Sequence, residues 1–331
     1  MRYIKKGGAT YHCMSRTIQG RAMLGRGEQE VLRKMIWRLA DFSGLKIITY
    51  CIMSNHFHVL VEVPEEVEVS DDELVRRFRV LYPLPSKHQE LRAEDVAHLL
   101  AENGEVGQAL RQSLLNRMGD LSIFMKALKQ RYSVWYNRTH ETYGAFWSER
   151  FKSVLVEGRA FALQAVAAYI DLNPVRAGIV KDPKDYRFCG YAEALAGRQP
   201  AAEAGVRKIM QAFQKAEIRT AEALPGYREI LFDRASQAVT GKAGISREKA
   251  LRVIEKERGA LSLPSVLRCR LRYISEGLAI GSEAFLRELM KDPRCALTRS
   301  GRKRKLRQAQ GHSLSGLRII SGRVEDTTDE G

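Results

Sequence analysis

The sequence contains few cysteines and no long apolar segment. Its five cysteines are scattered and include no Cys-x-x-Cys pair, so neither a disulfide framework nor a thiolate zinc site is indicated. No stretch approaches the roughly 18 apolar residues that a membrane-spanning helix requires. The basic N-terminus runs into Tyr11-His12-Cys13 without the apolar core of a signal peptide. We therefore expect a cytoplasmic protein that makes no contact with membranes.

Acidic residues are too few to balance the basic ones. The 331 residues include 55 Lys and Arg against 39 Asp and Glu, which gives a formal charge of +16. Hydrophobic residues make up 44% and charged residues 28%, so a disordered or collagen-like chain is excluded. A polyanionic partner is the first hypothesis for a folded chain of this charge, although a well-solvated basic surface has the same composition.

The first part of the chain predicts an α/β (α+β) domain to about residue 190, with an antiparallel sheet flanked by helices. Apolar residues recur at helical spacing in some segments, and β-forming residues are concentrated in others. The expected strands are 9–16, 46–53, 56–63 and a strand ending at 156, and the expected helices are 29–42, 121–138 and 160–172. The segment 65–119 has short helix-like pieces without β alternation, which we interpret as a helical insertion.

The remainder of the chain predicts a second, all-helical domain. The segment 191–205 is rich in Ala, Gly and polar residues and is the best linker candidate. Residues 206–300 contain expected helices at 246–258, 264–276 and 282–290, which permit either a helix-turn-helix-like unit or a plain bundle. The last segment, 301–331, is basic and then acidic, which is typical of a mobile tail.

Two histidines lie two residues apart in the strand 56–63. Because side chains alternate across a strand, His56, His58, Leu60 and Glu62 share one face, while the other face is formed by Phe57, Val59, Val61 and Val63. Two imidazoles on one side of a rigid strand suit joint coordination of one divalent cation. Two half-buried structural histidines are the alternative. His12, a lone histidine on the first strand, is more commonly structural.

Tyr169 and Asn173 lie one helical turn apart at the end of helix 160–172, on the same face. Tyrosine, with a pKa near about 10, is a poor nucleophile unless a cation or a base stabilises its phenolate. A metal ion bound nearby would lower the barrier to attack on a phosphodiester. Taken alone, Tyr169 is also compatible with packing at a helix end, and Asn173 before Pro174 with a helix stop.

These motifs occur in an order that resembles a known family. The sequence contains His56-Phe57-His58, then Trp147-x-x-Arg150-Phe151-Lys152, then Tyr169-x-x-x-Asn173-Pro174-Val175-Arg176-Ala177-Gly178. Together they resemble the single-tyrosine HUH transposases, and more closely the REP-associated tyrosine transposases of the IS200-like family. The resemblance covers about residues 1–190. It implies metal-dependent cleavage of single-stranded DNA, in which a tyrosine forms a 5′-phosphotyrosine link and leaves a free 3′-OH.

The resemblance also implies a role for each matching residue. His56, His58 and Asn173 match the metal ligands, and Tyr169 matches the nucleophile. Mg²⁺ or Mn²⁺ is the expected ion. The expected substrate is hairpin-forming single-stranded DNA, cleaved and rejoined by a monomer or a homodimer. The alternative is a domesticated, non-catalytic DNA-binding protein or repressor that keeps the same fold.

Several basic residues are expected to contact DNA. They lie near aromatic residues in the sequence, and this mixture of positive charge and stacking faces suits a single strand. Aromatic residues at helical spacing are also common in protein cores. The six residues assigned to this role are Lys126, Lys129, Arg131, Arg150, Lys152 and Arg176.

Overall fold

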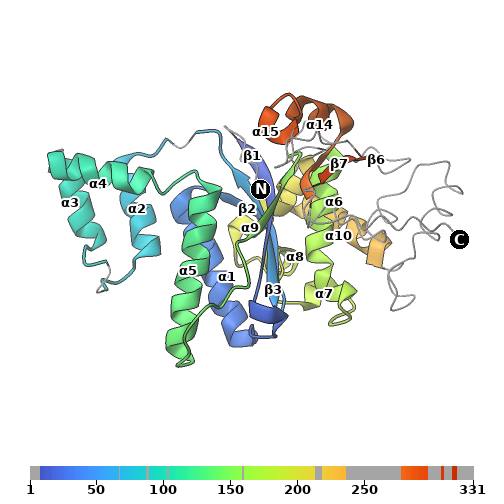
Figure 1. Cartoon of the computed structure of the whole chain (residues 1–331), viewed down its shortest axis with the longest axis horizontal. Coiled ribbons are helices and arrows are strands. Elements are labelled where there is room, and N and C mark those ends of the chain that lie inside the picture. The colour runs from blue at the N-terminus through green and yellow to red at the C-terminus, as the bar shows by residue number, and fades with distance from the viewer. Residues whose placement is uncertain are drawn as a thin grey trace, which may run out of the picture.

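The structure, a computed structural model, describes residues 8–66, 68–86, 89–102, 104–158, 160–212, 218–235, 277–296, 307–308 and 315–318. This part of the chain forms a seven-stranded sheet with the order β2-β3-β1-β4-β5-β7-β6 (Figure 1). The first four strands are β1 (Ala9–Arg16), β2 (Lys46–Ile52), β3 (His56–Val63) and β4 (Lys152–Val156). They pair antiparallel throughout, which confirms the expected antiparallel sheet.

Strand β1 lies between β3 and β4 and pairs with β3 over its whole length, from Ala9 opposite Val63 to Arg16 opposite His56. Alternation along β3 divides its side chains between the two faces, as expected from the sequence. Phe57 and Val59 are fully buried on one face, in the larger of two apolar clusters. The histidines of β3 lie on the other face.

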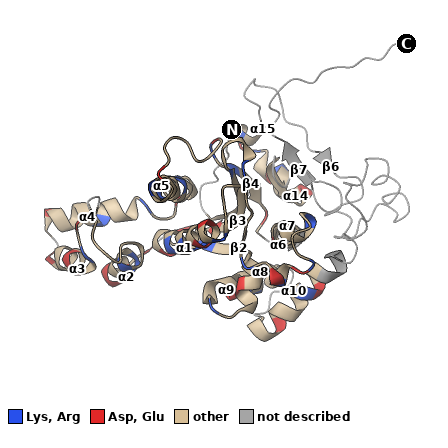
Figure 2. Cartoon of the chain, turned by 90° about the horizontal axis from the view of Figure 1, so that it is seen from below, with Lys and Arg blue, Asp and Glu red and all other residues tan. Residues whose placement is uncertain are grey.

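Two amphipathic helices, α1 (Arg26–Ser43) and α5 (Leu121–Thr139), cover the first face (Figures 1 and 2). Helix α1 ends at Gly44, whose φ of +69° is a left-handed conformation that glycine adopts without steric cost. Helix α5 begins after Asp120, whose side chain accepts a hydrogen bond from the Ile123 N–H at 2.8 Å. No helix in the described part of the chain is long and apolar enough to cross a membrane.

The second face carries the helices that follow β4 in the sequence. Helix α6 (Ala160–Asp171) is rich in alanine, and nearly all of its described side chains are buried against the sheet. The short α7 (Asn173–Arg176) continues from it. Beyond these lie α8 (Gly190–Leu195), α9 (Pro200–Gln211) and α10 (Thr220–Ala235) (Figure 2). Figure 2 also shows Lys and Arg residues on helices at both faces, so the positive charge is not confined to one side.

The segment 65–119 contains three helices, α2 (Asp71–Leu81), α3 (Ala93–Glu102) and α4 (Glu105–Leu115). They project away from the sheet beside α1 and α5 (Figure 1). Their apolar faces, which include Phe78 and Val96, join the core under α1. Two short 3₁₀ helices, η1 (Ile18–Gly20) and η2 (Pro183–Asp185), complete the connections.

The expected linker at 191–205 and the domain boundary near 190 differ from the structure. The segment forms α8 and the first half of α9, and Tyr191, Ala202 and Val206 are buried in the same apolar cluster as α6. Its small residues allow close packing. A Cβ on Gly205 would overlap the backbone oxygen of Ile48 in β2, so the glycine lets α9 approach the strand backbone.

The expected all-helical C-terminal domain must also be corrected. Strand β5 (Gly277–Gly281) pairs parallel with β4, and β7 (Ser315–Arg318) and β6 (Arg307–Gln308) extend the sheet from the expected tail. The segment 277–281 is short and apolar, and it is buried because it lies inside the sheet, between β4 and β7. Helix α14 (Glu283–Leu289), capped by Ser282, matches the expected helix 282–290, and α15 (Pro293–Ala296) follows. The expected helices 246–258 and 264–276 lie outside the described residues.

Replacement of Gly205 tests the packing of α9 on β2. We expect Gly205→Ala to lower the free energy of unfolding by about 1–3 kcal/mol, because the added methyl group overlaps the Ile48 carbonyl. The matched control is Gly27→Ala in α1, where a Cβ meets no atom within 4 Å. That change should be neutral or stabilising. Urea denaturation measures both, and equal effects of the two substitutions would contradict the close packing.

Candidate active site

A cavity of about 190 Å³ opens where β1 and β3 meet the end of α6. It brings together residues from β1, β3, the approach to β4, α6 and α7. Four of the residues that line it are the metal ligands and the nucleophile expected from the sequence, and Arg150 and Lys152 are two of the expected DNA contacts. The lining consists of Met14, Ser15, Arg16, His56, His58, Glu149, Arg150, Lys152, Tyr169 and Asn173.

The two histidines of β3 are held in different ways. The ring centroids of His56 and His58 are 5.0 Å apart, with the planes nearly perpendicular. His56 Nδ1 lies 2.6 Å from the side-chain oxygen of Asn55, which precedes it in the turn. Because a neutral imidazole donates from one nitrogen and accepts through the other, this contact leaves His56 Nε2 as the acceptor or ligand atom. His58 is buried, with 2% of its surface exposed.

His12 of β1 holds the second of these histidines. Its Nε2 lies 2.9 Å from His58 Nδ1, and the two rings stack with centroids 5.0 Å apart. One of the two nitrogens donates the hydrogen bond, so the tautomer of His58 is coupled to that of His12. The sequence favoured a structural role for His12, because a lone histidine is more commonly structural. Its contact with His58 arises from the pairing of β1 with β3, which are distant in the sequence.

Both histidines of β3 are held in the neutral form. Burial lowers the pKa of His56 to about 4, and the Arg16 guanidinium adds to the effect. Burial also lowers the pKa of His58 well below its usual range, followed by the charges that His12 and His56 would carry if protonated. Neutral imidazole is the form that binds a metal ion, so the site is ready for a cation without first losing a proton.

Tyr169 faces the histidines from the end of α6. Its ring is half-buried and meets the ring of His58 edge-on, with centroids 5.9 Å apart. The Arg176 guanidinium lies over the Tyr169 ring, 4.6 Å from the ring centroid. This is a cation–π contact, which places a positive charge beside the nucleophile candidate. The sequence spacing predicted that Tyr169 and Asn173 lie next to each other, but it did not predict the contact between Tyr169 and Arg176.

Asn173 presents one defined atom to the cavity. Its side-chain nitrogen donates to the carbonyl oxygens of Tyr169 at 3.0 Å and of Ile170 at 3.3 Å. The amide oxygen is therefore the atom suited to a cation. Two neutral imidazoles and an amide oxygen fit Mg²⁺ or Mn²⁺ if water or substrate oxygens supply the other ligands. Among the described residues, no group of three His, Cys, Asp or Glu side chains forms a metal site.

The six basic residues assigned to DNA separate into two groups. Arg150, Lys152 and Arg176 lie at the cavity or against Tyr169. The other three lie on α5, which covers the opposite face of the sheet. Arg131 donates to the Tyr82 hydroxyl at 2.7 Å and Lys129 to the Glu149 carbonyl at 2.5 Å, while Lys126 is exposed.

Arg16 and Glu149 are cavity residues that the sequence did not indicate. Arg16 lies opposite His56 in the β1–β3 pairing, so its guanidinium is brought to the site by the register. Glu149 lies within 3.2 Å of Lys152 in an ion pair at the rim. Arg16 reaches the cavity through strand pairing, and Glu149 occupies an unspecified position of the Trp147-x-x-Arg150 element.

A buried carboxylate anchors the helix that carries Tyr169. Asp171 is fully buried and accepts hydrogen bonds from the Thr49 hydroxyl at 2.8 Å, the Tyr227 hydroxyl at 2.7 Å and the Tyr191 N–H at 3.2 Å. It thereby joins α6 to β2, α8 and α10. Burial raises the pKa of Asp171 to about 6, although the three hydrogen bonds act in the opposite direction.

The titration of Asp171 gives a test by pH. Folding raises its pKa from roughly 4 to about 6, so the folded protein binds this proton more tightly than the unfolded chain. The resulting stability is present below about pH 4 and is lost as the pH rises through about 6. The side chain of Asp171→Asn does not titrate. As the pH rises from about 4 to about 6, we therefore expect the free energy of unfolding of this variant to increase by about 2–3 kcal/mol relative to that of the wild type. Urea denaturation across this pH range would contradict the assignment if the difference between the two proteins stayed constant.

Replacement of His12 tests its hold on His58. We expect His12→Ala to weaken Mn²⁺ binding by about 10- to 100-fold, because His58 loses the partner that orients its ring. Titration calorimetry measures the affinity. The control is His98→Ala, because His98 is an exposed histidine on α3, with its Nε2 3.2 Å from a Glu102 carboxylate oxygen. Equal Mn²⁺ affinity in His12→Ala and wild type would show that His58 needs no support from β1.

The fold and the cavity define a class of protein: an α+β domain in which a histidine pair and a tyrosine converge at one end of an antiparallel sheet. Residues 5–81 match the family described as "Transposase IS200 like". This segment runs from β1 to the end of α2 and includes His12, His56 and His58. The expected relation to the IS200-like transposases is thereby confirmed over this segment, which relates it to proteins that process DNA in transposition. Tyr169 and Asn173 lie beyond it.

Comparison with solved structures gives a REP-associated tyrosine transposase bound to a REP hairpin. That protein is 17% identical to this chain, and the match covers 61% of this chain and 88% of that chain, with a TM-score of 0.39. A search of curated proteins found no match.

Proposed function

We propose that this protein cleaves and rejoins single-stranded DNA, with Tyr169 as the nucleophile. The observation that carries the proposal is the convergence of Tyr169, His56, His58 and Asn173 on one cavity, although they come from segments more than 100 residues apart. The family match of residues 5–81 supports it independently, since that segment contains both histidines. The preference for hairpin-forming strands is part of the proposal and comes from the resemblance of the motifs.

The chemical step is an in-line displacement at phosphorus. The phenol oxygen of Tyr169 loses its proton and attacks phosphorus. The bond from phosphorus to the 3′ oxygen breaks, and that oxygen leaves and takes up a proton. The products are a 5′-phosphotyrosine link and a free 3′-OH. Because one phosphodiester replaces another, attack by a second 3′-OH rejoins the strand and regenerates tyrosine without a high-energy donor. The reaction therefore suits strand transfer as well as cleavage.

The residues around Tyr169 have distinct tasks in this step. Arg176 contacts the face of the Tyr169 ring and helps to hold the ring in the cavity. Arg16, Arg150 and Lys152 line the cavity and attract the phosphates on either side of the cleaved bond. A divalent cation held by His56, His58 and Asn173 would neutralise charge on the phosphodiester oxygens. Mg²⁺ and Mn²⁺ both suit this role.

Removal of one oxygen tests the nucleophile. A hairpin-forming strand from the flanks of the protein's own gene, labelled at its 3′ end, should give a slowly migrating covalent adduct on a denaturing gel with Mg²⁺ or Mn²⁺. Tyr169→Phe should abolish the adduct and change binding by less than about twofold, because only the attacking oxygen is lost. The control is Tyr143→Phe, since Tyr143 is 99% exposed and lies outside the cavity lining. Persistence of the adduct in Tyr169→Phe would exclude Tyr169 as nucleophile.

The same gel tests the metal ligands and the polarity of cleavage. His56→Ala should abolish cleavage at any concentration of Mg²⁺ or Mn²⁺, because the cation loses one of its two imidazoles. A strand labelled at its 5′ end should be released as a shorter product whose 3′-OH a DNA polymerase can extend. Binding without cleavage or adduct across several hairpins and both metals would favour a non-catalytic DNA-binding protein.

A further inference from the structure

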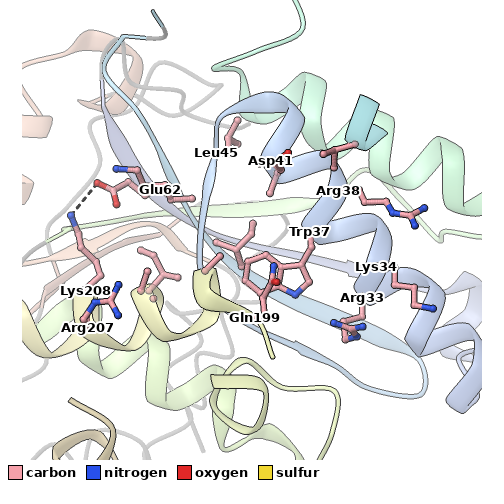
Figure 3. A pocket seen from close by; sticks show the side chains of 18 of the residues that line it. Arg33, Lys34, Trp37, Arg38, Asp41, Leu45, Glu62, Gln199, Arg207 and Lys208 are labelled. Carbon is pink, nitrogen blue, oxygen red and sulfur yellow. Dashed lines mark hydrogen bonds and ion pairs between the residues drawn. The ribbon is translucent and has the colours of Figure 1, made fainter. Parts of the chain in front are cut away.

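A second and larger cavity lies between α1, β2 and α9, with a volume of about 970 Å³ (Figure 3). We call it the α1–α9 groove. Trp37 and Arg38 of α1 line one side, Lys46 of β2 lies at the floor edge, and Arg207 and Lys208 of α9 line the other side. None of the residues that line the active-site cavity takes part in it.

The groove and the candidate active site lie at opposite ends of β3. Glu62 lines the groove and His56 lines the active-site cavity, six residues away along the strand. At a rise of about 3.3 Å per residue, the two positions are roughly 20 Å apart. A ligand in the groove therefore does not occupy the space of the reacting phosphate.

Basic side chains in the groove exceed the carboxylates that could neutralise them. Seven Lys and Arg residues line it against two acidic residues, Asp41 and Glu62. Each acid is already used: Asp41 pairs with Arg76 at 2.9 Å, and Glu62 pairs with Lys208 at 3.0 Å. Figure 3 shows the second pair on the α9 side of the groove.

Four of the cations that line the groove form no ion pair with a described acidic residue. Among the residues that the structure describes, Lys34, Arg38, Lys46 and Arg207 form no ion pair, while Arg33 pairs with Glu30 at 2.7 Å. The four come from both walls and the floor, so their positive potentials add within the concave surface. An anionic ligand with several charges would relieve this repulsion.

Trp37 supplies a flat apolar surface among the basic side chains that line the groove (Figure 3). The side chain is half-buried, and its Nε1–H donates to a Glu193 carboxylate oxygen at 2.8 Å. The ring of Tyr50 packs edge-on against it, with centroids 6.0 Å apart. These two contacts fix the orientation of the indole, so a planar group stacking on it would bind to a preorganised surface.

We propose that the α1–α9 groove binds a short segment of single-stranded nucleic acid, with its phosphates on the unpaired cations and a base against Trp37. A cationic groove with an aromatic face is the arrangement that recognises single strands irrespective of sequence. The bases of a duplex stack on one another and offer no free face to a side chain in a concavity. An acidic polypeptide would satisfy the charges but would leave the indole without a planar partner.

The test measures binding where cleavage is impossible. All proteins carry Tyr169→Phe and His56→Ala, so the result does not depend on the proposed strand cleavage. Fluorescence anisotropy with a short labelled oligo(dT) gives the affinity over a range of salt concentrations. We expect Arg38→Ala/Lys46→Ala/Arg207→Ala to weaken binding about 10-fold and to reduce the slope of log affinity against log salt by about 2, as for the loss of three phosphate contacts.

The matched control removes the same charge elsewhere. Arg79→Ala/Arg92→Ala/Lys291→Ala replaces three exposed cations that line neither cavity, and it should change the affinity by less than about twofold. Equal loss in the two triple variants would mean that only net charge matters and would overturn the proposal. Circular dichroism and thermal unfolding of each variant confirm that it is folded.

A second measurement places the base on Trp37. Oligo(dT) should quench the tryptophan fluorescence of the parent protein, and Trp37→Phe should lose most of that quenching although two other tryptophans remain. Unchanged quenching in Trp37→Phe would place the stacked base elsewhere. Duplex DNA or polyglutamate that binds as tightly as oligo(dT), with the same dependence on the three cations, would overturn the assignment to a single strand.

Discussion

The pairing of β1 with β3 is the contact on which the candidate site depends. It runs over eight residues and sets Met14 opposite His58 and Arg16 opposite His56. Because side chains alternate with a period of two, a slip of one residue would turn His12 into the apolar core and Cys13 toward the cavity. The buried face of β1 prevents such a slip, since Tyr11 and Cys13 are buried in the core beside Phe57 and Val59. Core packing thereby fixes the geometry of polar residues on the opposite side of the sheet.

The histidines gain their chemical character from the same arrangement. His58 is buried and His56 is half-buried, and burial is the first cause of the low pKa of both imidazoles. A residue that accepts no proton at neutral pH keeps a lone pair for a cation. On the adjacent helix, Asp171 is buried as well and keeps α6 attached to β2 through Thr49. Tyr169 therefore faces the histidines from a support that is itself fixed in the core.

Local sequence patterns predicted the elements that build the active site. The period of 3.6 predicted α5 to within one residue and α1 apart from its first turn. The β-forming residues predicted the β2–β3 hairpin, and the proline after Asn173 marked the end of α6. The histidine pair and the tyrosine were recognisable for the same reason, because each motif lies within one element. His12 and Arg16 were not, because their roles arise from pairing between strands that are more than 40 residues apart.

The errors beyond residue 190 have a common physical origin. Small residues such as Ala202 and Gly205 resemble a linker in composition, but here they allow α9 to lie against the backbone of Ile48. Strand β5 has five residues, too few for alternation to distinguish it from a short buried helix. Both features are apparent only when the partner surface is known, and that surface is formed by residues far away in the sequence.

The parallel pairing of β4 with β5 has a consequence for synthesis of the chain. Leu155 of β4 pairs with Ala279, about 120 residues later. At the usual rate of translation, the outer edge of β4 stays unpaired for on the order of ten seconds after it leaves the ribosome. During that interval the nascent sheet has four strands and an open edge that can accept a foreign strand. Chaperones that shield strand edges during translation would therefore protect this protein before its last strands emerge.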